Sequence, residues 1–159
     1  DEILYHPLGL DKYLEKLSEG KFRGSAGRSE YATASGYEII HQREKEKPFD
    51  FSRSIFSQRS YGVRQLEYDK SVITSLDFYW STGCHTVEGF PQNYDLKLKL
   101  LHFNHLDYDL IKNLNEKFHS NQDPIAGGVH RIGKDFENWW AGAERKSTKL
   151  PEEILRINL

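Results

Sequence analysis

A strand pattern runs directly into a helix pattern between residues 96 and 118. Leucine and lysine alternate over "LKLKL" (96–100), which is typical of a β-strand that buries one face. From Leu110 onward, apolar residues recur at spacings of three and four, which predicts an amphipathic helix with Asp107 as its N-cap. A chain that holds both patterns side by side is expected to pack helices against a sheet.

Other segments repeat the two patterns. We expect strands in "DEIL" (1–4), in "EYATASGYEIIHQ" (30–42) with an interruption at Gly36, in "VRQLEY" (63–68) and in "SLDFYWSTGCHT" (75–86). Helices are expected from about Gly9 to Ser18, in "KDFENWWAGAER" (134–145) and after Pro151. The sequence therefore predicts an α/β (mixed α+β) fold, a mixed sheet flanked by helices.

Composition narrows the class of protein. With 159 residues and 37% hydrophobic content, the chain is long enough for one domain over 1–159. The formal charge of -2 lacks the basic surplus that nucleic-acid binding needs, and no apolar run reaches the roughly 20 residues of a membrane span. The single cysteine, Cys84, forms no internal disulfide and favours a reducing compartment, the cytoplasm. Because the chain begins at Asp1 and contains no Met, we expect an excerpt of a longer protein.

Histidines stand at two predicted strand ends. Strict alternation places His102 on the face of Leu96, Leu98 and Leu100. An imidazole on such a face satisfies its ring nitrogens by hydrogen bonds, as a core residue, or by a metal. The second histidine, His85, follows Cys84 and is a candidate ligand for a metal or a phosphate.

Acidic residues open the chain. Asp1 and Glu2 precede Ile3, and paired carboxylates bind hard divalent cations, although an exposed terminus has the same appearance.

Four segments in order, "DEILYHP", "GYEIIH", "STGCHTVEG" and "LKLLHFNHLDYDL", resemble family-2-type glycosyltransferases with a GT-A fold. The resemblance covers roughly residues 1 to 132. In that family a nucleotide-binding half precedes a D-x-D-E run, and "DEILYHP" looks like the second half of this run. The resemblance implies that the chain is the acceptor-side, C-terminal portion of such an enzyme, with a partial GT-A-like sheet.

The resemblance also implies roles for residues. Transfer of a sugar from a nucleotide-sugar donor to a glycan, lipid-linked or other hydroxyl acceptor needs a divalent ion, Mn²⁺ or Mg²⁺, to neutralise the leaving diphosphate. By this analogy Asp1 and His85 bind the metal, and His102 contacts the donor phosphate. Glu38 and Glu88 are the candidate catalytic bases. Imidazole ligation would favour Mn²⁺.

Two other functions stay open. The aromatic share of 13% suits a non-catalytic carbohydrate-binding or interaction module, whose rings stack on sugars. A metal hydrolase built on His85, His102, His105 and Asp107 ranks last, because the spacing matches no hydrolase motif.

Overall fold

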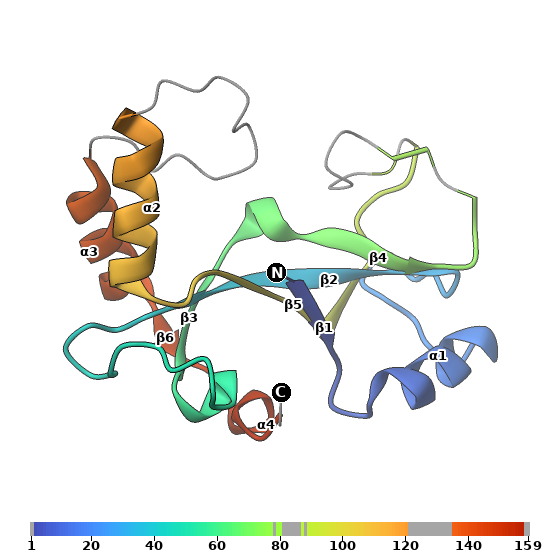
Figure 1. The fold of residues 1–159 in the computed structure, drawn as a ribbon. Helices are drawn as coiled ribbons and strands as arrows, with labels where there is room; N and C mark the ends of the chain where they lie inside the picture. The colour runs from blue at the N-terminus through green and yellow to red at the C-terminus, as the bar shows by residue number, and fades with distance from the viewer. Residues whose placement is uncertain (1, 78, 81–86, 88, 121–134, 158–159) are drawn as a thin grey trace. The chain divides into compact units, whose positions relative to one another are not determined.

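The computed structural model describes residues 2–77, 79–80, 87, 89–120 and 135–157, and its fold is mixed α/β, as the sequence predicts. Within these residues a six-stranded sheet is combined with four α-helices and two short 3-10 turns (Figure 1). The elements are β1 (Glu2–Tyr5), α1 (Leu10–Ser18), β2 (Tyr31–Ile40), η1 (Ile55–Ser57), β3 (Tyr61–Arg64), η2 (Leu66–Tyr68), β4 (Lys70–Thr74), β5 (Tyr94–His105), α2 (Tyr108–Ser120), α3 (Phe136–Lys146), β6 (Thr148–Lys149) and α4 (Glu152–Leu155).

The sheet does not follow chain order. Its strands run β1-β5-β2-β3-β6, and β4 pairs with β2 beside this path. β1 is antiparallel to β5, in a register that sets Glu2 opposite His102 and Tyr5 opposite Lys99. β1 therefore pairs with residues that lie 94 to 100 positions later in the chain.

Contacts divide the chain into two compact units, each made of two stretches. Unit 1 is Asp1–Glu38 with Arg64–His102, and unit 2 is Ile39–Val63 with Phe103–Leu159. Both β2 and β5 begin in unit 1 and end in unit 2. The prediction of one domain over 1–159 stays a prediction.

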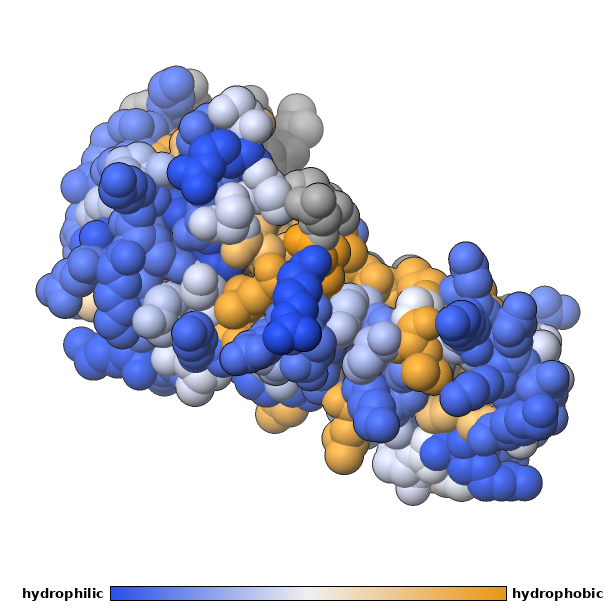
Figure 2. All heavy atoms as spheres, turned by 90° about the horizontal axis from the view of Figure 1, so that it is seen from below, coloured by the Kyte–Doolittle hydropathy of each residue, from blue (hydrophilic) through white to orange (hydrophobic). Residues whose placement is uncertain are grey.

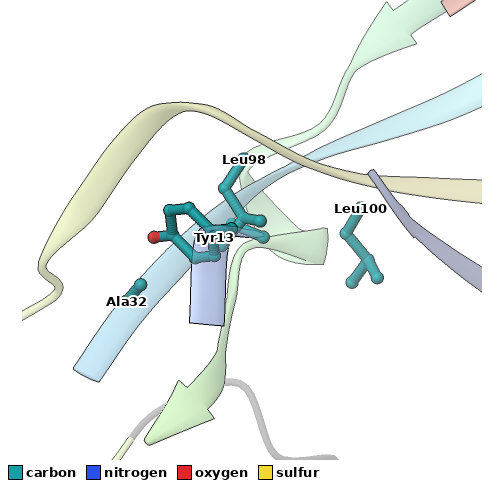
Figure 3. Packing of buried hydrophobic residues seen from close by; sticks show 5 residues of the cluster. Tyr13, Ala32, Leu98 and Leu100 are labelled. Atoms are coloured by element: carbon teal, nitrogen blue, oxygen red, sulfur yellow. The ribbon is translucent and has the colours of Figure 1, made fainter. Parts of the chain in front are cut away.

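The core of unit 1 confirms most of the leucine alternation. Tyr13 of α1 packs with alanines of β2 and with Leu98 and Leu100 of β5 (Figure 3). His102 is also buried, as the alternation predicts. Leu96 is 77% exposed, so the expectation that it points inward is wrong. It lies three residues before Lys99, where pairing with β1 begins, and outside this cluster.

In unit 2 the predicted cap of α2 is confirmed. The amide of Leu110 donates to Oδ1 of Asp107 over 2.9 Å, which satisfies a backbone donor in the first turn. Ile40, Val63 and Ala143 form a small core with the partly buried Trp139 against it. The ring of Trp140 is fully buried.

Three strand expectations change. β2 runs through Gly36 without the predicted interruption. "VRQLEY" forms the end of β3 and then η2. β4 ends at Thr74, where Oγ1 accepts a hydrogen bond from the amide of Leu76 over 2.9 Å and turns the chain. The described residues of 75–80 form no regular strand beyond an isolated bridge at Trp80.

Hydrophilic side chains cover most of the face shown in Figure 2, with smaller apolar areas between them. Among the described residues, no helix has both the length and the apolar character to cross a bilayer.

Candidate functional site

The register of β1 and β5 brings an acid and an imidazole together in unit 1. Nε2 of His102 lies 3.0 Å from Oε1 of Glu2. The His102 side chain is 6% exposed, whereas that of Glu2 is 32% exposed. At this distance the Glu2 carboxylate forms an ion pair with the imidazole when the ring is protonated. A ligand arriving from solvent meets Glu2 first.

Lys70, the first residue of β4, contacts the same carboxylate. Its Nζ donates to Oε1 of Glu2 over 2.6 Å, and its side chain is 16% exposed. The Glu2 oxygen therefore lies between an ammonium group and an imidazole. This concentrates a fixed positive charge and a proton-carrying ring at one place.

Tyr68 forms the next layer of the site. Its ring stacks on His102 with centroids 4.0 Å apart and planes 16° apart. Burial raises the pKa of Tyr68 to about 12, and the negative charge of the nearby Glu38 carboxylate contributes to the rise. The phenol is therefore protonated at neutral pH. We refer to Glu2, Glu38, Tyr68, Lys70 and His102 as the Glu2–His102 cluster.

Glycine at position 36 allows η2 to reach β2. A Cβ on Gly36 would lie 2.4 Å from Cβ of Tyr68 and 2.6 Å from its carbonyl carbon. Such distances are far inside van der Waals contact, so any larger residue would push Tyr68 away. Gly36 sits two residues before Glu38, which gives a physical reason for a glycine in "GYE".

A buried ion pair holds η2 from the other side. Arg64 contacts both carboxylate oxygens of Asp69, with Nη1–Oδ1 at 2.6 Å and Nη2–Oδ2 at 2.7 Å. The Gly36 amide and the Tyr94 hydroxyl also donate to Asp69. Burial alone would raise the pKa of Asp69, but these hydrogen bonds lower it below its ordinary value. Asp69 thereby ties η2 to β2 and β5.

The structure brings together two of the five predicted site residues. His102 and Glu38 both belong to the Glu2–His102 cluster, joined through Tyr68. Glu38 is only 1% exposed, so in this arrangement it is buried near Tyr68 rather than facing solvent. Its role as a base stays a prediction. Asp1, His85 and Glu88 lie outside the described residues.

Three of the four residues of the hydrolase hypothesis lie in the described part of the chain. His102 belongs to unit 1, whereas His105 and Asp107 belong to unit 2. The His105 ring packs against Trp139 at 4.6 Å between centroids, and Asp107 accepts from backbone amides. Local partners in unit 2 therefore account for both residues.

The described donors of the Glu2–His102 cluster are few for a divalent ion. Glu2 and His102 supply one oxygen and one nitrogen, while the Lys70 ammonium already contacts Glu2. Among the described residues, no group of three or more His, Cys, Asp or Glu side chains is arranged to hold a metal. A metal here would depend on the predicted ligands Asp1 and His85.

Sequence reasoning missed Lys70 and Tyr68. Both lie in "LEYDKS", which reads as the end of a strand and a turn, and no local pattern marks a tyrosine that stacks on a distant histidine. Glu2 was recognised as an acid, but its partner was not.

The cluster combines two carboxylates, an ammonium group, an imidazole and a phenol, which suits the binding of a polar ligand and the movement of a proton. Comparisons of this chain with protein-family models, with curated proteins and with solved structures find no match.

Proposed function

We propose that the chain is the acceptor-side portion of a metal-assisted glycosyltransferase, which transfers a sugar from a nucleotide-sugar donor to a glycan, lipid-linked or other hydroxyl acceptor. One observation carries the proposal. Three of the four segments that resemble the family, "DEI", "GYE" and "LLHF", contribute Glu2, Glu38 and His102 to a single cluster in unit 1. These residues are far apart in the sequence, so only the tertiary fold brings them together.

The steps of sugar transfer indicate which role each of these side chains would have. The acceptor oxygen forms a bond to the anomeric carbon, the bond from that carbon to the diphosphate oxygen breaks, and the electron pair leaves with the diphosphate. The acceptor proton passes to a base. His102 and Lys70 are the groups that would offset the growing charge on the diphosphate, and both lie beside the Glu2 carboxylate.

Two further parts of the proposal rest on the sequence. Glu38 and Glu88 are the candidate bases. When bound through Asp1 and His85, Mn²⁺ or Mg²⁺ would supply positive charge for the leaving group. The proposal also places the protein in the cytoplasm, with no nucleic-acid partner.

The test measures nucleotide binding and sugar transfer. UDP and GDP are titrated into the longest natural form that contains this sequence, with Mn²⁺, with Mg²⁺ and with EDTA, and release of nucleotide from a panel of nucleotide sugars is followed. We expect ion-dependent binding that is weakened in Glu2→Gln and unchanged in Glu15→Gln, an exposed glutamate on α1. If no nucleotide binds with either ion, the proposal is wrong.

One observation favours a non-catalytic carbohydrate-binding module instead. Tyr79 is 85% exposed and its neighbour Trp80 is 40% exposed, and exposed rings stack on sugars. Glycan-array binding that is lost in Tyr79→Ala but kept in His102→Gln would support this alternative.

A further inference from the structure

Unit 1 contains a pocket that lies apart from the Glu2–His102 cluster along β5. Its volume is about 330 Å³, within the range of small-molecule sites. α1, the segment after β1 and the start of β5 contribute its walls. The pocket residue Lys97 lies five positions before His102, which is about 17 Å along an extended strand at roughly 3.3 Å per residue.

The pocket is strongly basic in a chain of net charge -2. Four cations line it, Lys16, Lys21, Arg23 and Lys97, against one carboxylate, Asp95. Lys21 is paired with Glu19 at 2.9 Å. Within the described part of the chain, neither Lys16 nor Lys97 forms a salt bridge, and both side chains are exposed. Two ammonium groups are therefore available to an anion.

A buried histidine forms part of the pocket lining. The Leu8 amide donates to Nδ1 of His6 over 3.2 Å, so the ring proton is on Nε2, which faces Asp95 at 3.6 Å. His6 is 5% exposed and packs on the Tyr13 ring at 4.3 Å. Burial lowers the pKa of His6, Asp95 opposes this, and Lys97 and Lys16 lower the pKa further. The imidazole is therefore neutral at pH 7, and the positive charge comes from the lysines.

We propose that this pocket binds the phosphate group of an organic phosphate. Two ammonium groups match the two negative charges that a phosphate monoester carries near neutral pH. Leu8 and the half-buried Phe22 give the pocket an apolar wall, against which the organic part of the ligand packs. The inference stands on the pocket alone and does not rest on the proposed function.

The probes are inorganic phosphate and hexyl phosphate, titrated into the chain and followed by calorimetry and by amide NMR shifts. We expect saturable binding that each of Lys16→Gln and Lys97→Gln weakens about tenfold, the effect of losing one charge-assisted contact. Lys12→Gln is the matched control, because Lys12 is exposed on α1 and does not line the pocket. Tighter binding of hexyl phosphate than of inorganic phosphate would support the apolar wall.

Vesicles with and without phosphatidic acid distinguish a lipid headgroup from a soluble phosphate. Vesicle binding that depends on Lys16 and Lys97 supports a lipid source, and binding of soluble phosphates alone supports a free ligand. The proposal is overturned if no phosphate binds in either form, or if Lys12→Gln weakens binding as much as Lys97→Gln.

Discussion

Both units place an acidic side chain beside basic partners, but Asp107 in unit 2 is buried whereas Glu2 in unit 1 is exposed. Asp107 in unit 2 accepts from the Leu110 amide over 2.9 Å and the Phe49 amide over 2.7 Å, with Arg59 at 3.5 Å. The Glu2 carboxylate in unit 1 contacts the side chains of Lys70 and His102, and a third of the side chain is exposed. Backbone partners cannot leave without unfolding the segment, whereas side-chain partners can exchange with a ligand. Asp107 therefore stabilises unit 2, whereas the partners of Glu2 are side chains that a ligand could replace.

The largest expected effect comes from a substitution that removes the hydrogen bonds and the ion pair of Arg59 in unit 2. The Arg59 side chain is fully buried and donates to backbone carbonyls, including Lys47 O and Gln58 O, each at 3.0 Å. Arg59→Ala leaves these acceptors and Asp107 without their partner, so we expect the free energy of unfolding to fall by about 3–5 kcal/mol. Urea denaturation measures this. Arg156→Ala is the control, because its pair with Glu152 is exposed and worth about 0.5 kcal/mol or less.

In unit 1 we expect a large loss of activity and only a small loss of folding stability. If the proposed function holds, His102→Gln should lower nucleotide-sugar transfer about 100-fold, near 2.7 kcal/mol of transition-state stabilisation. It should lower the free energy of unfolding by only about 1–2 kcal/mol, for the lost contact with Glu2 and the lost stacking on Tyr68. Initial rates and urea midpoints of the same preparations are compared. If His102→Gln unfolds but keeps its activity per folded molecule, His102 serves stability as Asp107 does, and the proposed difference between the two units is wrong.

Gly36→Ala tests how closely η2 must approach β2. The new Cβ would overlap Tyr68, so we expect a loss of about 1–3 kcal/mol, typical of overpacking. Gly142→Ala is the control: a Cβ there would meet nothing closer than the Arg145 side chain at 3.9 Å, and Gly142 lies within α3. It should leave stability unchanged or raise it, since alanine is the better helix former. Equal effects at the two sites would contradict the role given to Gly36.

The smallest expected effect is a dependence of folding stability on pH through Asp69. The pKa of Asp69 lies below its ordinary value of 3.8 in the folded state, because hydrogen bonds from Arg64, Gly36 and Tyr94 outweigh its burial. Its contribution to stability is therefore complete above that ordinary value and is lost as the pH falls through the folded pKa. The difference in urea midpoint between the natural chain and Asp69→Asn should be largest at neutral pH and shrink below about pH 4. A constant difference across this range would contradict the assignment.

Much of the fold was predictable because its signals are local. The spacing of Leu10, Tyr13, Leu14 and Leu17 predicted α1, although Leu14 is exposed, and Asp107 was recognised as the cap of α2 from its place before the apolar stripe. Leu98, Leu100 and His102 alternate as expected, since side chains on a strand point to opposite faces in turn. Leu96 was mispredicted, because alternation says which face a residue takes but not how far the neighbouring layer extends.

The candidate site was predictable only in part. Glu38 and His102 were selected through the family resemblance, and the structure joins them through Tyr68. Tyr68 and Lys70 carried no signal, because both sit in a turn whose sequence resembles many solvated turns.

The sequence by itself determined which segments become strands or helices in most of the chain, because hydrophobic period and capping act over a few residues. Only the tertiary structure decided that Glu2 faces His102 across β1 and β5, that Tyr68 covers the imidazole and that four basic side chains share one pocket. Strand order and register depend on the summed packing of the whole sheet, and no stretch of sequence holds that information alone.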